Sequence, residues 1–139
     1  MLDQIVDSVF ELGKIIRKIE LSKDESARII QTLGGNEAET ILFQKLGKYW
    51  NQQSFFDRPD GLIVVTNYRL VFLAKVKTIL TKSDFLSFPL EFIKDVDITR
   101  VMLMSPAIKF NFEGKIYKFT FFSNPTDVRD AVRKAKGIV

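Results

Sequence analysis

The chain has 139 residues, of which 46% are hydrophobic and 27% charged; this composition excludes a disordered chain and suffices for one domain with its own core. Cysteine and histidine are both absent, which excludes disulfides, thiolate and histidine catalysis and the usual zinc ligands. The net charge of +4 is uneven, since residues 1–57 carry 7 basic and 9 acidic side chains and residues 58–139 carry 14 and 8, so the C-terminal part favours anionic partners.

Two helices are predicted at the start of the chain. Apolar residues at three- and four-residue steps are typical of an amphipathic helix over about residues 3–20. Ser22 and Glu25 have the spacing of a capping box, in which each side chain bonds to the backbone amide of the other residue. A second helix therefore begins there, and Gly34-Gly35 ends it, because glycine accepts the left-handed conformation that follows many helices. The stripe of the first helix consists of Leu2, Ile5, Val6, Val9, Leu12, Ile16 and Ile19.

After the two helices, residues 39–73 have sequence patterns that suit β-strands. Residues 39–50 are ambiguous, because their apolar residues fit both a strand period and a helix period. Residues 62–66 and 68–73 are rich in β-branched and aromatic side chains and meet at Thr66-Asn67, where asparagine tolerates a turn. This pattern predicts a β-hairpin.

A second hairpin is predicted from the alternation at residues 108–112, a tight turn at Glu113-Gly114-Lys115 and a strand over residues 116–122. Shorter strands are expected at residues 88–93 and 96–104, and Pro89 indicates a sheet edge or a strand start.

A terminal helix is predicted after Asn124, the candidate N-cap, with Pro125 at its first position. Val128, Ala131, Val132 and Ala135 share one face of it. Six or seven short strands followed by one amphipathic helix are typical of an α+β fold, a small bent antiparallel β-barrel capped by a C-terminal helix, here with an N-terminal helical extension.

The residues from Gly61 to Phe72 read Gly-Leu-Ile-Val-Val-Thr-Asn-Tyr-Arg-Leu-Val-Phe. They resemble the glycine, alternating apolar residues, Thr-Asn-x-Arg-Leu and terminal Phe of GRAM domains and bacterial pleckstrin-homology-like domains. Phe88-Pro89-Leu90-x-x-Ile93-x-x-Val96 is similar to the strand that follows in these families. The resemblance covers about residues 37–137 and implies a pleckstrin-homology-like domain over residues 37–139. The two predicted helices lie outside it and form an N-terminal helical extension over residues 1–36.

The resemblance also implies that residues 39–50 hold the first strand and that Arg69 is structural, bonding to neighbouring carbonyls. Relatives bind ligands at the open end of the barrel, where three loops are expected to gather. The candidate ligand-binding residues of this end are basic or apolar: Phe55, Phe56, Arg58, Lys77, Lys82, Phe85 and Lys115. The phenylalanines suit a bilayer interface or a protein contact, and the cations suit acidic head groups.

No catalytic residue, cofactor or metal site is predicted, because histidine, cysteine and Gly-rich phosphate loops are missing and Asp95 and Asp97 have the spacing of solvent-facing charges. Residues 115–122 partly match the aromatic strand of RNA-binding sheets, but core aromatics of a barrel explain the pattern better, so a nucleic-acid partner is not favoured.

The sequence therefore predicts a non-catalytic adaptor whose partner is another protein or a second copy of the chain, with the N-terminal helices as an oligomer contact. Binding of anionic lipid head groups is the alternative. The first residues have no signal-peptide pattern and no apolar run approaches about 18 residues, so we expect a cytoplasmic protein that can sit peripherally on a membrane.

Overall fold

The computed structural model describes residues 22–51, 58–74, 85–102, 104–121 and 123–137. Within these ranges it has two α-helices, seven strands and one short 3-10 helix. The first predicted helix, over residues 3–20, lies outside them. In chain order the elements are α2 (Lys23–Thr32), β1 (Ile41–Tyr49), β2 (Asp60–Thr66), β3 (Arg69–Ala74), β4 (Phe85–Pro89), η1 (Leu90–Phe92), β5 (Ile93–Val101), β6 (Ser105–Phe112), β7 (Lys115–Thr120) and α3 (Thr126–Ala135).

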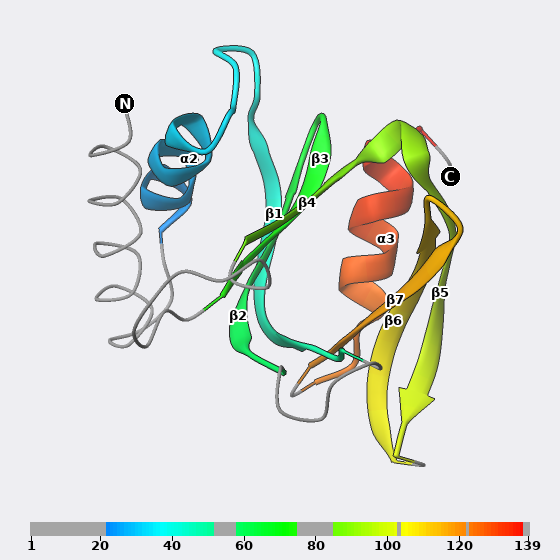
Figure 1. Ribbon diagram of the computed structural model, residues 1–139. Helices are drawn as coiled ribbons and strands as arrows, with labels where there is room; N and C mark the ends of the chain where they lie inside the picture. Colours follow the sequence, from blue (N-terminus) through cyan, green and yellow to red (C-terminus); the bar gives the residue numbers. More distant parts are fainter. Residues whose placement is uncertain (1–21, 52–57, 75–84, 103, 122, 138–139) are drawn as a thin grey trace.

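The strands form one antiparallel sheet in the order β4-β3-β2-β1-β7-β6-β5. β1 joins the two halves of the bent sheet, because it pairs with β2 along most of its length but with β7 only at Lys48 and Tyr49. Figure 1 shows α3 on the inner side of the bend. Its Val128 and Val132 are fully buried in the main core. The predicted α+β fold, a small bent antiparallel sheet closed by the C-terminal helix, is confirmed.

The predicted capping box begins α2. The Ser22 hydroxyl accepts a hydrogen bond from the Glu25 amide at 3.1 Å, and the Glu25 carboxylate accepts one from the Ser22 amide at the same distance. After Thr32 the chain reaches Gly34, whose φ of 86° is the left-handed conformation expected after a helix. Both ends of α2 therefore follow from local sequence.

α2 packs on the outer face of β1, β2 and β3, on the side of the sheet opposite α3 (Figure 1). Ile29 and Ile30 are buried there, and the buried Ser26 hydroxyl donates to the Gln44 side chain of β1 at 2.7 Å. The apolar side of α2 is thus used within the chain. The sheet residues in this second core are Leu62, Val64, Val71 and Leu73.

Arg69, at the start of β3, joins several parts of the chain. Its guanidinium pairs with Glu39, and it donates to the carbonyl oxygens of Ile30 and Leu33 at the end of α2. It also donates to the Ser87 hydroxyl of β4 at 3.1 Å. These contacts confirm the structural role that the resemblance implied for this arginine.

The ambiguous stretch at residues 39–50 contains strand β1, as the resemblance implied. The first predicted hairpin is confirmed as β2 and β3, with Asn67 in the turn, where its side chain bonds to the backbone of Ala38 and Thr40. This asparagine ties the turn to the lead-in of β1.

The strand expected at residues 88–93 is only partly right. β4 ends at Pro89, and Leu90–Phe92 form the 3-10 helix η1 at the corner before β5. Pro89 lies on an edge strand, where a residue without an amide hydrogen is tolerated. The next strand extends from Ile93 to Val101, three residues short of the expected end at residue 104, because Met102 has a positive φ of 48° and begins the turn to β6.

The C-terminal helix begins one residue later than predicted. Pro125 occupies the N-cap position instead of the first helical position. Asn124 still serves the helix start, because its side-chain oxygen accepts from the Thr126 amide at 3.0 Å.

The second hairpin is confirmed as β6 and β7, but its turn is shorter than expected. Phe112 pairs directly with Lys115, so the turn contains only Glu113 and Gly114, with φ of 53° and 79°. Two positive φ angles are typical of the two-residue hairpin turn that suits the twist of the strands. The shorter turn decides which residues of β6 and β7 lie opposite each other.

Candidate functional site

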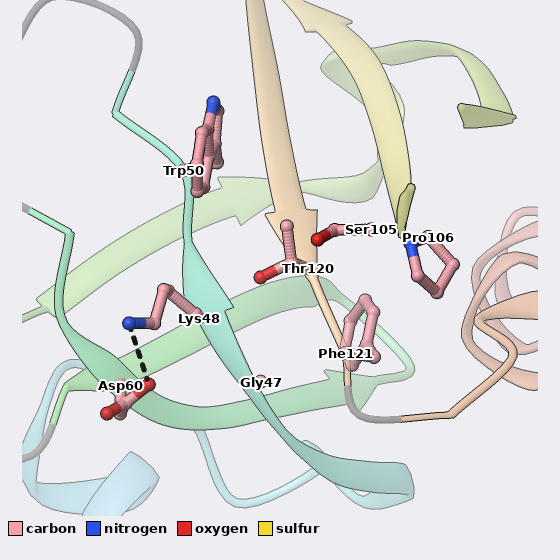
Figure 2. Close-up of a pocket in the computed structure, with 8 residues that line it drawn as sticks. All are labelled: Gly47, Lys48, Trp50, Asp60, Ser105, Pro106, Thr120 and Phe121. Carbon is pink, nitrogen blue, oxygen red and sulfur yellow. Dashed lines mark ion pairs between the residues drawn. The ribbon is translucent and has the colours of Figure 1, made fainter. Parts of the chain in front are cut away.

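A pocket of about 290 Å³ opens where β1 leaves β7. Figure 2 shows Lys48 and Asp60 on one side of it and Ser105, Pro106 and Phe121 on the other. Strand pairing positions these groups, because Lys48 lies opposite both Thr120 of β7 and Asp60 of β2. The complete lining is Gly47, Lys48, Trp50, Asp60, Ser105, Pro106, Thr120 and Phe121.

Gly47 permits the close packing at the base of this pocket. A Cβ atom at this position would lie 2.8 Å from Cε1 of Phe121 and 2.8 Å from the carbonyl oxygen of Thr120. Contacts this short do not occur between a Cβ and such atoms without displacement. Glycine at residue 47 therefore sets how near Phe121 comes to β1.

The charges of the pocket are largely balanced. Lys48 Nζ lies 3.6 Å from Asp60 Oδ1, and both side chains are substantially exposed. The Arg58 guanidinium lies over the ring of the pocket residue Trp50, 3.7 Å from its centroid, and the Arg58 Nε donates to the Asn51 carbonyl. The pocket thus combines an aromatic wall, hydroxyl groups and one solvent-exposed ion pair, a lining suited to binding a polar or peptide-like group.

Two methionines project from the turn between β5 and β6, next to the pocket residue Ser105. Met102 is 71% exposed and Met104 is 81% exposed, the largest exposures among the large hydrophobic side chains of the described residues. The Met104 amide donates to the Met102 carbonyl at 2.8 Å, which closes the turn. Figure 1 shows this turn at the far tip of the β5–β6 hairpin. We call Met102 and Met104 the methionine turn.

The structure describes only some of the ligand-binding residues expected from the sequence. Arg58 lies against Trp50, and Lys115 is exposed at the start of β7 with its ammonium 5.1 Å from the Tyr117 ring. Phe85 begins β4, where its backbone pairs with Leu73. Phe55, Phe56, Lys77 and Lys82 lie outside the described residues. The gathering of the three loops at one end of the barrel therefore stays a prediction.

Sequence reasoning missed a row of side chains on the outer face of β6, β7 and β1. Lys109 lies directly opposite Lys118, and the Trp50 amide donates to the Lys118 carbonyl, which sets Trp50 opposite Lys118. The two-residue turn at Glu113-Gly114 was the signal for the lysine pair. The sequence predicts the turn at Glu113-Gly114-Lys115, and the shorter turn needs a positive φ at Glu113, which residues other than glycine, asparagine and aspartate seldom adopt.

Aromatic side chains of β7 point into the core. Phe119 is fully buried, and Tyr117 packs against the same core, where its ring lies 4.8 Å from that of Phe88 between centroids. Rings in this position cannot stack on nucleic-acid bases, so the interpretation of β7 as a barrel strand with core aromatics is supported.

In the described part of the chain there is no group of three or more acidic, histidine or cysteine side chains placed to hold a metal ion. Asp95 and Asp97 are exposed, and each is engaged locally: Asp95 accepts from the Asn111 amide group and Asp97 from the Ile98 backbone amide. Neither α2 nor α3 has the length and apolar character that crossing a bilayer requires, within the residues described.

Comparison with known proteins connects this geometry to a family. Residues 36–136 match the family model described as "Bacterial PH domain". None of the curated proteins compared with the chain matches it. The match covers most of the chain and includes every strand of the bent sheet as well as α3.

Several solved structures share the fold. The Vps36 N-terminal PH domain is 20% identical, with a TM-score of 0.59 over 74% of this chain and 83% of its own. A DUF1696 family protein with a pleckstrin-homology domain from Shewanella loihica PV-4 is 15% identical, with a TM-score of 0.54 over 84% of this chain and 95% of its own. The pleckstrin homology domain from Shewanella amazonensis SB2B is also 15% identical, with a TM-score of 0.54 over 83% and 98%. Structural likeness at such low sequence identity shows a common fold alone, so the ligand has to be argued from the site itself.

Proposed function

Because this chain belongs to the bacterial PH domain family, we propose that it is a non-catalytic adaptor that binds a protein partner or a second copy of itself. The contact surface is the methionine turn together with the pocket beside it. Pleckstrin-homology-like domains commonly bind proteins or lipids, and the residues of this site favour a protein. The GRAM relationship and a cytoplasmic location remain predictions of the sequence.

The observation that carries the proposal is the exposure of Met102 and Met104, 71% and 81%. Exposed apolar side chains that stand together mark interaction surfaces, and methionine is common on such surfaces because its unbranched, polarizable chain adapts to different partners. The pocket next to the turn supplies polar groups that would orient a bound segment, namely the hydroxyls of Ser105 and Thr120 and the Lys48–Asp60 pair.

The ion pair also favours protein over lipid at this surface. Asp60 neutralises Lys48, and its side chain is 58% exposed. An anionic membrane would meet this carboxylate as well as the lysine, so little net attraction remains.

Anionic lipid binding is the second candidate function, at the open end of the barrel where the sequence predicts that three loops gather. The net charge of residues 58–139 supports it, and so does the exposed position of Lys115. Self-association through the N-terminal helices is a separate proposal. It rests on the apolar stripe of residues 3–20 alone, since α2 packs on its own sheet.

Site-directed photo-cross-linking tests the adaptor proposal. A photoreactive amino acid replaces Met104 in the full chain, and irradiation in cell extract or with purified protein identifies what lies against the turn. We expect discrete cross-linked species, including a dimer if the partner is a second copy. Excess parent protein should compete for them, and a Met102→Ser/Met104→Ser variant should not.

The matched control carries the photoreactive group at Glu37, which is exposed and lies in the segment between α2 and β1. The same species from both positions, or competition by the double variant, would contradict the proposal. Circular dichroism of the double variant should equal that of the parent, because both methionines are exposed.

A further inference from the structure

We propose that the outer face of β6, β7 and β1 binds an acidic segment of the partner protein, with a carboxylate held between Lys109 and Lys118. This inference rests on the proposed adaptor function and names the chemistry of its partner. We call Lys109, Lys118 and Trp50 the lysine row.

Strand register places the row on one face. Lys109 pairs with Lys118 across β6 and β7, and Trp50 follows beside Lys118 on the β1 side. Phe110 follows Lys109 in the sequence and Phe119 follows Lys118, and both phenylalanines are buried in the core. Since side chains alternate between the faces of a strand, the members of the row all point outward.

The two lysines are the unusual feature of this face. Directly opposite residues of antiparallel strands have Cβ atoms about 4.5–5.5 Å apart, and like charges there destabilise the sheet. Among the described residues, neither Lys109 nor Lys118 has an ion pair or hydrogen bond from its side chain. Asp97 lies opposite Lys109 on β5 and partly offsets its charge, whereas Lys118 lies between Lys109 and Trp50 with no acidic residue of the described strands opposite it. One anion between the two ammonium groups would remove the repulsion and form two charge-assisted hydrogen bonds.

The surroundings favour a single acidic segment over a flat anionic surface. Asp97 lies beyond Lys109 on one side, and Asp60 lies beyond Lys48 on the other. A planar anionic membrane laid on this face would approach both carboxylates together with the lysines. A narrow segment can place one carboxylate at the centre and avoid both.

The row is also continuous with the proposed adaptor surface. Thr120, two residues after Lys118, lines the pocket together with Lys48 and Trp50. An extended partner segment can therefore present an acid to the lysine row and its next residues to the pocket and the methionine turn.

Trp50 provides a direct probe, because it is the chain's single tryptophan and lies beside Lys118. The full chain is titrated with hexaglutamate peptide while tryptophan fluorescence is recorded, with hexaglutamine as the uncharged comparison. We expect a saturable change with hexaglutamate alone, weakened by salt between about 50 and 300 mM. The Lys109→Gln/Lys118→Gln variant should bind at least about tenfold more weakly, because both charge-assisted bonds are lost.

The matched control is Arg129→Gln/Lys134→Gln, which removes the same charge from α3, a helix that belongs to neither proposed surface. It should bind within about threefold of the parent, and equal losses in both variants would overturn the proposal, since they would indicate attraction by net charge only. Lys118→Glu is the second variant. It replaces the lysine repulsion by an opposite-charge pair, so it should remain folded and lose binding.

Two further results separate this inference from the adaptor proposal. Absence of hexaglutamate binding, with Met104 cross-links intact, would overturn the acidic-segment assignment and leave the adaptor function standing. Binding of phosphatidylserine vesicles that Lys109→Gln/Lys118→Gln abolishes would assign the face to a membrane and overturn the inference as well.

Discussion

Arg69 and Glu39 form an ion pair that is almost completely removed from water. The Arg69 side chain is 12% exposed and that of Glu39 3% exposed, with Nε 2.9 Å from Oε2 and Nη2 3.2 Å from Oε1. The Thr66 hydroxyl donates to the same carboxylate at 2.7 Å. The pair joins the lead-in of β1 to the start of β3, while the remaining donors of Arg69 reach the end of α2 and β4.

Replacing Arg69 alone should be strongly destabilising. Arg69→Met leaves the Glu39 carboxylate buried without its cation, which lowers the free energy of unfolding by about 3–5 kcal/mol. Arg69→Met/Glu39→Leu should recover part of this loss, because no unpaired charge remains. Urea denaturation measures both. Arg129→Met is the control, since its partner Asp130 is 61% exposed, and it should cost less than about 1 kcal/mol. Similar losses for Arg69 and Arg129 would contradict the buried-pair interpretation.

Gly47→Ala should destabilise the pocket region. The added Cβ meets Phe121 and the Thr120 carbonyl at 2.8 Å, and displacing this packing costs about 1–3 kcal/mol. Thermal unfolding measures the loss, and the fluorescence of Trp50, which lines the same pocket, should shift. Ser123→Ala, at an exposed position, is the control and should leave both properties unchanged. An unaltered unfolding temperature in Gly47→Ala would show that Phe121 moves aside without cost.

Lys118→Glu should stabilise the sheet. The change removes the repulsion between two lysines and adds an attraction between the introduced glutamate and Lys109. A favourable cross-strand pair raises the free energy of unfolding by about 0.2–1 kcal/mol. The unfolding temperature at low salt should therefore rise by a few degrees, and the increase should shrink at high salt. Lys134→Glu makes the same charge change in the last turn of α3, where a negative charge opposes the helix dipole, so it should lower the unfolding temperature. A decrease in both variants would contradict the lysine-pair argument.

Co-sedimentation with vesicles tests the lipid alternative at the loop end expected from the sequence. If that end binds head groups, the parent should sediment with anionic vesicles and not with neutral ones, and salt should release it. A folded Phe55→Ser/Phe85→Ser variant should lose this binding, whereas Met102→Ser/Met104→Ser should retain it. Sedimentation with neither kind of vesicle would leave protein binding as the sole function proposed for the domain.

Local sequence was sufficient for most of the elements. The capping box at Ser22 and Glu25 begins α2 because its two hydrogen bonds lie within one turn. The hairpin of β2 and β3 was predictable for a similar reason: alternating apolar residues flank a turn at Asn67, whose side chain bonds to nearby backbone. Short-range hydrogen bonds and side-chain alternation do not depend on the rest of the fold.

The candidate site was harder to predict from the sequence, because its residues come together only through the pairing of strands that are distant in the chain. Lys48 reaches Thr120 because β1 pairs with β7, and Ser105 reaches this pocket because β6 follows on the other side of β7. The pairing of Lys109 with Lys118 could not be predicted without the length of the turn between β6 and β7, since one extra turn residue would shift the register of the two strands.

The sequence by itself determined the fold class, the absence of histidine and cysteine chemistry and most element positions, because periodicity, caps and composition are local properties. Tertiary structure alone decided where the apolar face of α2 is buried, which partner Arg69 has, and which charges share the outer face. Each of these three features depends on the sheet register and brings together segments that lie far apart in the sequence. They form only when the chain folds, because burial of apolar side chains and pairing of strands then fix which residues meet.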